Sequence, residues 1–356
     1  MSKNRRGDEM NLKLFFSLVG GSMALAVYAH YFSGNEMLQF VTASLAIIFL
    51  AAWLGKSTES VAHYAGDRIG GFLNATFGNA AELIIAFFLV KEGLFDMVKA
   101  SITGAIIGNM LLVLGLSTLL GGLKYKEQTF NSRLASHNAS LMTLAIVALF
   151  IPAVFMFDLP VIKVEIISIV IASLLIIAYI LWLIFSMITH SDFLSDIEPQ
   201  ESDAVWPKGV SLLMLAVSTF FVAVVSEWLV EGVQHVSESL GWSELFVGAF
   251  VIAIIGNAAE HSAAMLLALK GRIGAAVEIA IGSSLQIALF VAPTLVIMSL
   301  LLGNPMDIVF STFELAAIGV ATFITISITR DGATNWFEGV LLLTVYIILG
   351  TVFFFA

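Results

Sequence analysis

Two glutamates lie inside long apolar stretches of the sequence and close a five-residue motif that occurs twice. The motif Gly-Asn-Ala-Ala-Glu ends once in Glu82 and once in Glu260. On a helix, the spacing from Asn79 to Glu82 and from Asn257 to Glu260 places each amide on the same face as its carboxylate. A charged side chain in an apolar membrane segment costs about 2.5 to 3.5 kcal/mol or more. Each glutamate must therefore face a partner or a water-filled cavity.

The chemistry of such a pair depends on what neutralises it. Two carboxylates that meet in a dehydrated site repel one another unless they share protons or hold a cation. Calcium prefers six to eight hard oxygen ligands, which the carboxylates, the oxygens of Asn79 and Asn257, and water could supply. Soft metals are less suited, because the chain has no cysteine and His261 is the only imidazole near the motifs.

Calcium and protons would compete for the same two carboxylates. Competition alone could then couple the two ions, so calcium is expected as a transported substrate and no cofactor is expected. The structural alternative is a protonated glutamate pair that only joins two helices.

The composition places these motifs in a polytopic membrane protein. Of the 356 residues, 59% are hydrophobic and 12% are charged, whereas about a quarter of the residues in a soluble protein carry charge. Spans of roughly 20 residues leave no room for a separate catalytic domain, so an enzyme is not expected. The net charge of −10 excludes nucleic acid as a main partner. The candidate spans cover residues 12–31, 37–56, 69–90, 98–121, 135–157, 162–188, 208–233, 244–269, 274–302, 307–329 and 336–356.

The basic residues favour one orientation in the lipid bilayer. With the N-terminus in the cytoplasm, only Lys91, Lys99 and Lys163 of the sixteen Lys and Arg residues fall on the outer side. This asymmetry follows the positive-inside rule. The C-terminus is then expected outside.

The repeated motif also predicts the architecture. Weaker parallels extend it, since Glu59 corresponds to Glu227 and Lys91 to Lys270. Each copy belongs to a half of five spans, and an odd number of spans inverts the second half relative to the first. The predicted fold is all-α, with about eleven transmembrane helices in two inverted repeats. Its parts are an N-terminal tail and first helix (1–35), a five-helix repeat (36–189), an acidic cytoplasmic linker (190–207) and a second five-helix repeat (208–356).

The linker between the halves has five acidic residues and no basic one. It can be a solvated connection or a regulatory loop that attracts cations, and both interpretations stay open. Its acidic residues are Asp192, Asp196, Glu198, Glu201 and Asp203.

At these motifs the chain resembles the calcium/proton exchanger family of the cation/calcium exchanger superfamily. Residues 78–82 are similar to the first family repeat, and residues 256–261, which include the trailing His261, are similar to the second. The stretch VEIAIGSSLQIALFVAP, from 277 to 293, resembles the ninth helix of the family, and Asn109 in GNMLLVLG resembles the fourth.

The resemblance implies a calcium/proton antiporter that works by alternating access. It implies that Glu82 and Glu260 hold calcium or protons and that Asn79 and Asn257 supply oxygen ligands. His261 lies next to Glu260. It could support the residues that bind the ion without binding it itself, or it could take part in proton transfer. The resemblance further implies that a polar pathway is lined by Asn109, Ser283 and Gln286, with Glu59 and Glu227 at its mouths.

Two other functions remain open at this stage. Sodium could replace the proton as counter-ion, as in the sister exchangers, or the pair of glutamates could be the filter of a passive cation channel. A homo-oligomer is compatible with the sequence. The chain lacks the long N-terminal extension of plant members, so the expected location is a bacterial plasma membrane.

Overall fold

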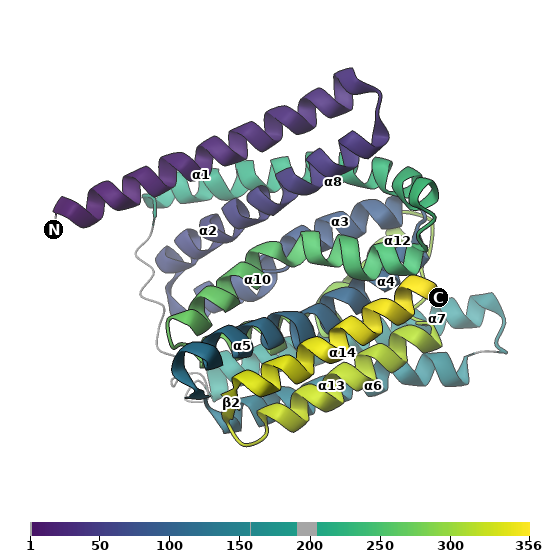
Figure 1. The fold of residues 1–356 in the computed structure, drawn as a ribbon. Coiled ribbons are helices and arrows are strands. Elements are labelled where there is room, and N and C mark those ends of the chain that lie inside the picture. Colours follow the sequence, from purple (N-terminus) through teal and green to yellow (C-terminus); the bar gives the residue numbers. More distant parts are fainter. Residues whose placement is uncertain (1, 157, 191–204) are drawn as a thin grey trace.

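The computed structural model describes residues 2–156, 158–190 and 205–356, and almost all of them are helical (Figure 1). Several helices continue through a π-helical turn (η) into the next. The elements are α1 (Ser2–Tyr28), η1 (Ala29–Ser33), α2 (Glu36–Phe77), α3 (Ala80–Lys91), α4 (Phe95–Ile107), η2 (Gly108–Val113), α5 (Leu114–Tyr125), β1 (Glu127–Thr129), α6 (Ser132–Phe155), α7 (Val161–Ile184), η3 (Phe185–Thr189), α8 (Lys208–Leu240), α9 (Glu244–Phe246), η5 (Val247–Ile252), α10 (Ala253–Leu269), α11 (Ile273–Gln286), η6 (Ile287–Val291), α12 (Ala292–Leu301), α13 (Thr312–Thr329), β2 (Ala333–Asn335) and α14 (Trp336–Phe355).

Ten helical segments of the described chain are long and apolar enough to cross a membrane. The protein is therefore an all-α, multi-pass membrane protein. Residues 67–91 are helical as well, but they are divided between the last part of α2 and α3. Gly66 turns the chain with a φ of 79°, and the second division falls at Asn79, whose φ and ψ of −96° and 23° leave the helical region. These residues correspond to the predicted span 69–90, the one predicted span that is not among the ten segments.

Four central helical stretches are irregular near the repeated motifs. The first is divided at Asn79, and the others contain η2, η5 and η6. Asn109 lies within η2, Asn257 follows η5 along the chain, and Gln286 directly precedes η6. Such π-turns inside helices are frequent at functional sites.

Small residues let α4 and η5 cross at very short range. A methyl group at Gly104 would collide with the backbone of Ala249, and one at Gly248 would collide with the side chain of Ala100. Close approach of this kind is how membrane helices gain packing energy without a hydrophobic driving force. The crossing fixes the fourth predicted span against the eighth, which carries the second motif.

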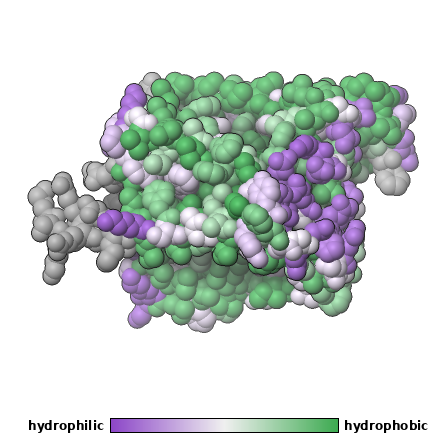
Figure 2. All heavy atoms as spheres, turned by 90° about the horizontal axis from the view of Figure 1, so that it is seen from above, coloured by the Kyte–Doolittle hydropathy of each residue, from purple (hydrophilic) through white to green (hydrophobic). Residues whose placement is uncertain are grey.

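The helix ends lie at two faces, at the left and right of Figure 1. We call one the linker face, because Tyr64 there donates a hydrogen bond to the carbonyl of Trp206, just after the linker. It also contains the antiparallel pair β1–β2, and Gln128 of β1 donates to the carbonyl of Ala268 at the end of α10. The opposite face contains residues 91–95, 231–243 and 302–311. Figure 2 shows hydrophobic side chains between the two polar ends, as expected for a bilayer-embedded surface.

Residues 302–311 on the opposite face correct one predicted boundary. The span predicted from residue 307 begins as a helix only at Thr312. Ser311 and Glu314 form a capping box that stabilises a helix start at this point. The preceding residues are extended and closely held by side chains.

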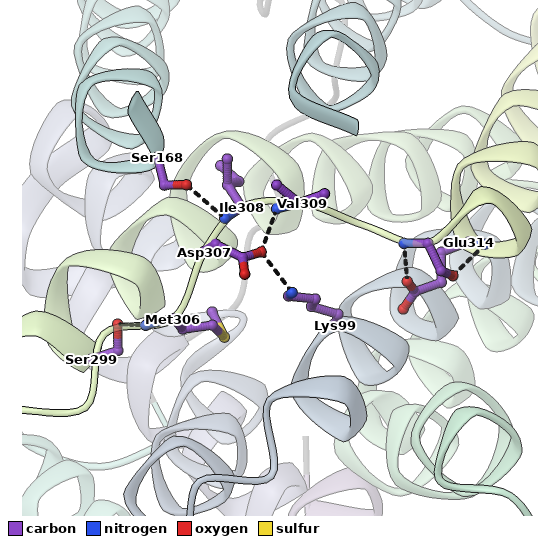
Figure 3. Close-up of polar contacts among 9 residues, drawn as sticks. Lys99, Ser168, Ser299, Met306, Asp307, Ile308, Val309 and Glu314 are labelled. Carbon is purple, nitrogen blue, oxygen red and sulfur yellow. Dashed lines mark hydrogen bonds and ion pairs between the residues drawn. The ribbon is translucent and has the colours of Figure 1, made fainter. Parts of the chain in front are cut away.

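Side chains from several helices bind this extended segment, as Figure 3 shows. Lys99 of α4 donates to Asp307 at 2.7 Å. The amide of Met306 donates to Ser299, and the amide of Ile308 donates to Ser168 of α7. The segment therefore joins α4, α7 and α12 at the opposite face, where its backbone groups would otherwise lack partners.

Candidate cation site

The two motif glutamates approach each other where α3 and α10 lie side by side (Figure 1). A methyl group at Gly256 would lie 3.3 Å from Cγ of Glu82. A methyl group at Gly78 would lie 3.6 Å from Oε1 of Glu260. Each glutamate thus packs against the glycine of the other motif copy, and the two carboxylates are close enough to repel one another.

The motif asparagines use their amide nitrogens within the protein. Asn79 Nδ2 donates to Gln286 Oε1 at 2.5 Å, and Asn257 Nδ2 donates to the carbonyl of Ala253 at 2.8 Å. Asn109 Nδ2 lies 3.5 Å from Asn257 Oδ1, at the limit of a hydrogen bond. Because the donors are engaged, these contacts orient amide oxygens for another ligand.

Four buried oxygens around the pair accept no hydrogen bond from any described residue. They are Asn79 Oδ1, Glu82 Oε2, Asn109 Oδ1 and Glu260 Oε2. A buried acceptor without a partner costs about 1 to 3 kcal/mol, so an arrangement of four is expensive without a ligand. Two carboxylates and two amide oxygens are the hard donors that calcium prefers.

No cluster of three or more His, Cys, Asp and Glu residues occurs in the described part of the chain. A cation at the pair therefore needs the amide oxygens and water in addition to the carboxylates. Ser283 lies near the Glu260 carboxylate and adds a hydroxyl to this environment.

A small cavity of about 20 Å³ adjoins Glu82 and Asn257. Its remaining lining is apolar apart from Ser101, and it extends from the pair toward the opposite face. The larger apolar side chains that line the cavity are those of Ile85, Ile102, Ile252, Ile287 and Val291. Few groups there could replace the hydration shell of an ion, so the cavity is not a hydrated path for a cation in this conformation.

The structure brings most of the predicted site residues together, but not all of them. Asn109, Ser283 and Gln286 contact the motif residues as described above, and His261 is buried beside Glu260. Glu59 is exposed toward the linker-face end of α2, whereas Glu227 lies toward the opposite end of α8. The five acidic residues predicted as a regulatory loop lie outside the described residues.

Sequence reasoning missed the ion pairs of two lysines. Lys91 binds Glu227 and Lys99 binds Asp307, each at 2.7 Å. The only signal for them was that both are among the few basic residues expected outside. Their partners lie far away in sequence, so no local pattern could identify them.

Comparison with known proteins identifies the family. The model of the sodium/calcium exchanger protein family matches residues 36–188 and 210–355. The chain belongs to the sodium/calcium exchanger family.

Relatives within this exchanger family cover nearly the whole chain. The Ca(2+)/H(+) antiporter of Aphanothece halophytica is 45% identical over 96% of this chain and 96% of its own length. The Ca(2+)/H(+) antiporter ChaA of Bacillus subtilis (strain 168) is 44% identical over 96% and 99% of the two chains. The solved structure of native YfkE superposes with a TM-score of 0.85 at 43% identity, covering 96% of this chain and 100% of that one.

Proposed function

We propose that this exchanger carries calcium out of the cell in exchange for protons. The observation that carries the proposal is the facing pair Glu82 and Glu260 with the unpartnered oxygens of Asn79 and Asn109 beside it. Relatives at 44 to 45% identity are named as Ca(2+)/H(+) antiporters, which supports the proton as counter-ion.

Coupling follows from the charge of the pair. A calcium ion neutralises both carboxylates, and protons do the same when calcium leaves. The bare pair is the costly state, because two adjacent carboxylates repel in a dehydrated site. Alternating access would then move the site between the faces only when it holds calcium or protons.

Two inverted repeats would supply the two conformations. The reciprocal contacts of Gly78 with Glu260 and of Gly256 with Glu82 support a pseudo-two-fold axis between the motifs. The packing of α2 on α10 and of α8 on α3 has the same reciprocity. In this proposal the linker face is cytoplasmic, the C-terminus is outside, and the protein lies in a bacterial plasma membrane.

Calcium uptake into proteoliposomes tests the proposed function. The interior is made acidic, sodium is omitted and the membrane potential is clamped. We expect calcium to accumulate above its equilibrium level, and a protonophore to collapse the accumulation. Flux that only equilibrates would contradict the proposal and indicate a channel. Accumulation that requires a sodium gradient would also contradict it, and would favour the sodium-coupled exchange included in the family description.

A further inference from the structure

One ion pair fastens the end of α3 to α8 at the opposite face. Lys91, the last residue of α3, binds Glu227 of α8 with an Nζ to Oε1 distance of 2.7 Å. The side chains are 47% and 43% exposed, so the pair is accessible to water. α3 carries Glu82, so the link joins a site helix to the neighbouring α8.

The sequence contains the same two residue types at the corresponding positions of the other half. Lys270 directly follows the last residue of α10, the helix that carries Glu260. Glu59 of α2 is the weaker sequence parallel of Glu227 of α8. Because the halves are expected to be inverted, this second pair would lie at the linker face.

The second pair is not formed in this structure. Glu59 and Lys270 are both exposed, and neither makes an ion pair with any residue that the structure describes. Lys56 on the same helix lies within electrostatic reach of Glu59, but its ammonium lies 4.1 Å from the ring centre of Phe15. The ion pair is therefore formed at the opposite face, whereas the parallel residues Glu59 and Lys270 at the linker face do not form one.

Burial of the two site helices shows the same asymmetry. After Glu82, α3 has no exposed residue before Lys91. After Glu260, the corresponding part of α10 exposes a stripe at helical spacing. The stripe consists of Ser262, Ala263 and Leu266 and continues to Lys270.

We propose that Lys91–Glu227 and Glu59–Lys270 are alternating latches of the exchanger. The first latch is closed in the conformation described here, in which the site is covered toward the opposite face. The second closes when the site is covered toward the linker face, and the first then opens. This inference rests on the alternating access in the proposed function. In it, Lys91 and Lys270 are residues that position α3 and α10.

The exposure of the pairs limits the effect of each latch. An exposed ion pair is weak because water screens it, so each latch shifts the balance between two conformations by no more than about fivefold. The latches therefore bias the equilibrium without locking it. A shift of this size suits a contact that must open in every transport cycle.

Cross-linking can test the proposal directly, because the chain has no natural cysteine. The variant Glu59→Cys/Lys270→Cys in native membranes would be treated with a short bifunctional thiol reagent. We expect slow cross-linking, because the structure holds the other latch closed. Adding Lys91→Gln should raise the rate about two- to fivefold. The charge exchange Lys91→Glu/Glu227→Lys should return it to the starting value.

Lys163→Gln is the matched control, since Lys163 is an exposed lysine of α7 without an ion pair among the described residues. It should leave the cross-linking rate unchanged. The proposal would be overturned if the cysteines at positions 59 and 270 never cross-link. It would also be overturned if Lys91→Gln leaves their cross-linking rate unchanged. The readout records conformation and not ion movement, so it stays valid if the counter-ion proves to be sodium.

Discussion

Replacing Glu82 or Glu260 by Gln is expected to abolish proton-driven calcium accumulation while the protein remains folded. Gln keeps the shape of the side chain but removes the charge that both ions require. A contact with a charged group contributes up to about 3 kcal/mol, so each variant should lose up to about 100-fold in transport rate, enough to remove net accumulation. Calcium uptake into proteoliposomes under an acid-inside gradient measures the loss.

Folding and surface charge can be controlled in the same experiment. The thermal unfolding temperature of either variant should not fall, because the substitution relieves the repulsion between adjacent carboxylates. Glu238→Gln removes an equal charge from an exposed position at the end of α8 and should transport normally. Accumulation at the wild-type level in Glu82→Gln or in Glu260→Gln would refute the role of the pair.

Gly104→Ala is expected to destabilise the protein by about 3 kcal/mol, which is the upper part of the range for overpacking. The added methyl group would overlap the backbone of Ala249, where α4 crosses η5. A backbone cannot rotate away as a side chain can, so the two helices must separate. Thermal unfolding in detergent, followed by size-exclusion chromatography, measures the change.

Gly319→Ala supplies the matched comparison for this effect. Gly319 lies within α13, and a methyl group there would have no neighbour within 4 Å. Alanine has a higher helix propensity than glycine, so this variant should be as stable as the wild type or more stable. Equal unfolding temperatures for Gly104→Ala and Gly319→Ala would show that the crossing is less tight than the structure indicates.

Much of this fold can be predicted from hydropathy, because a membrane span needs a long apolar run whatever it contacts. In the described chain, ten of the eleven predicted spans are helical segments long enough to cross a membrane, with some ends shifted by several residues, and the predicted span 69–90 is divided between two helices. The start of α13 was predicted too early, since the apolar residues before Thr312 continue the hydropathy signal. Ser311 and Glu314 carry the capping-box pattern that could have located it.

The members of the candidate site can be proposed from the sequence, but the contacts among them cannot. The repeated motif identifies Glu82 and Glu260, because an intramembrane carboxylate needs a functional reason. Nothing local in the sequence shows that Asn79 binds Gln286, or that Asn109 lies by Asn257. These contacts join residues of different helices, and they depend on the kink at Asn79 and on the π-turn at Asn109.

Proton release on calcium binding tests the central claim most directly. Calcium would be added to the purified protein in weakly buffered detergent solution near neutral pH, and the released protons would be measured with a pH indicator. The shared site predicts a release that is absent in the Glu82→Gln/Glu260→Gln variant, and a calcium affinity that falls as the pH is lowered. Calcium binding that releases no protons and has the same affinity at every pH would contradict the account.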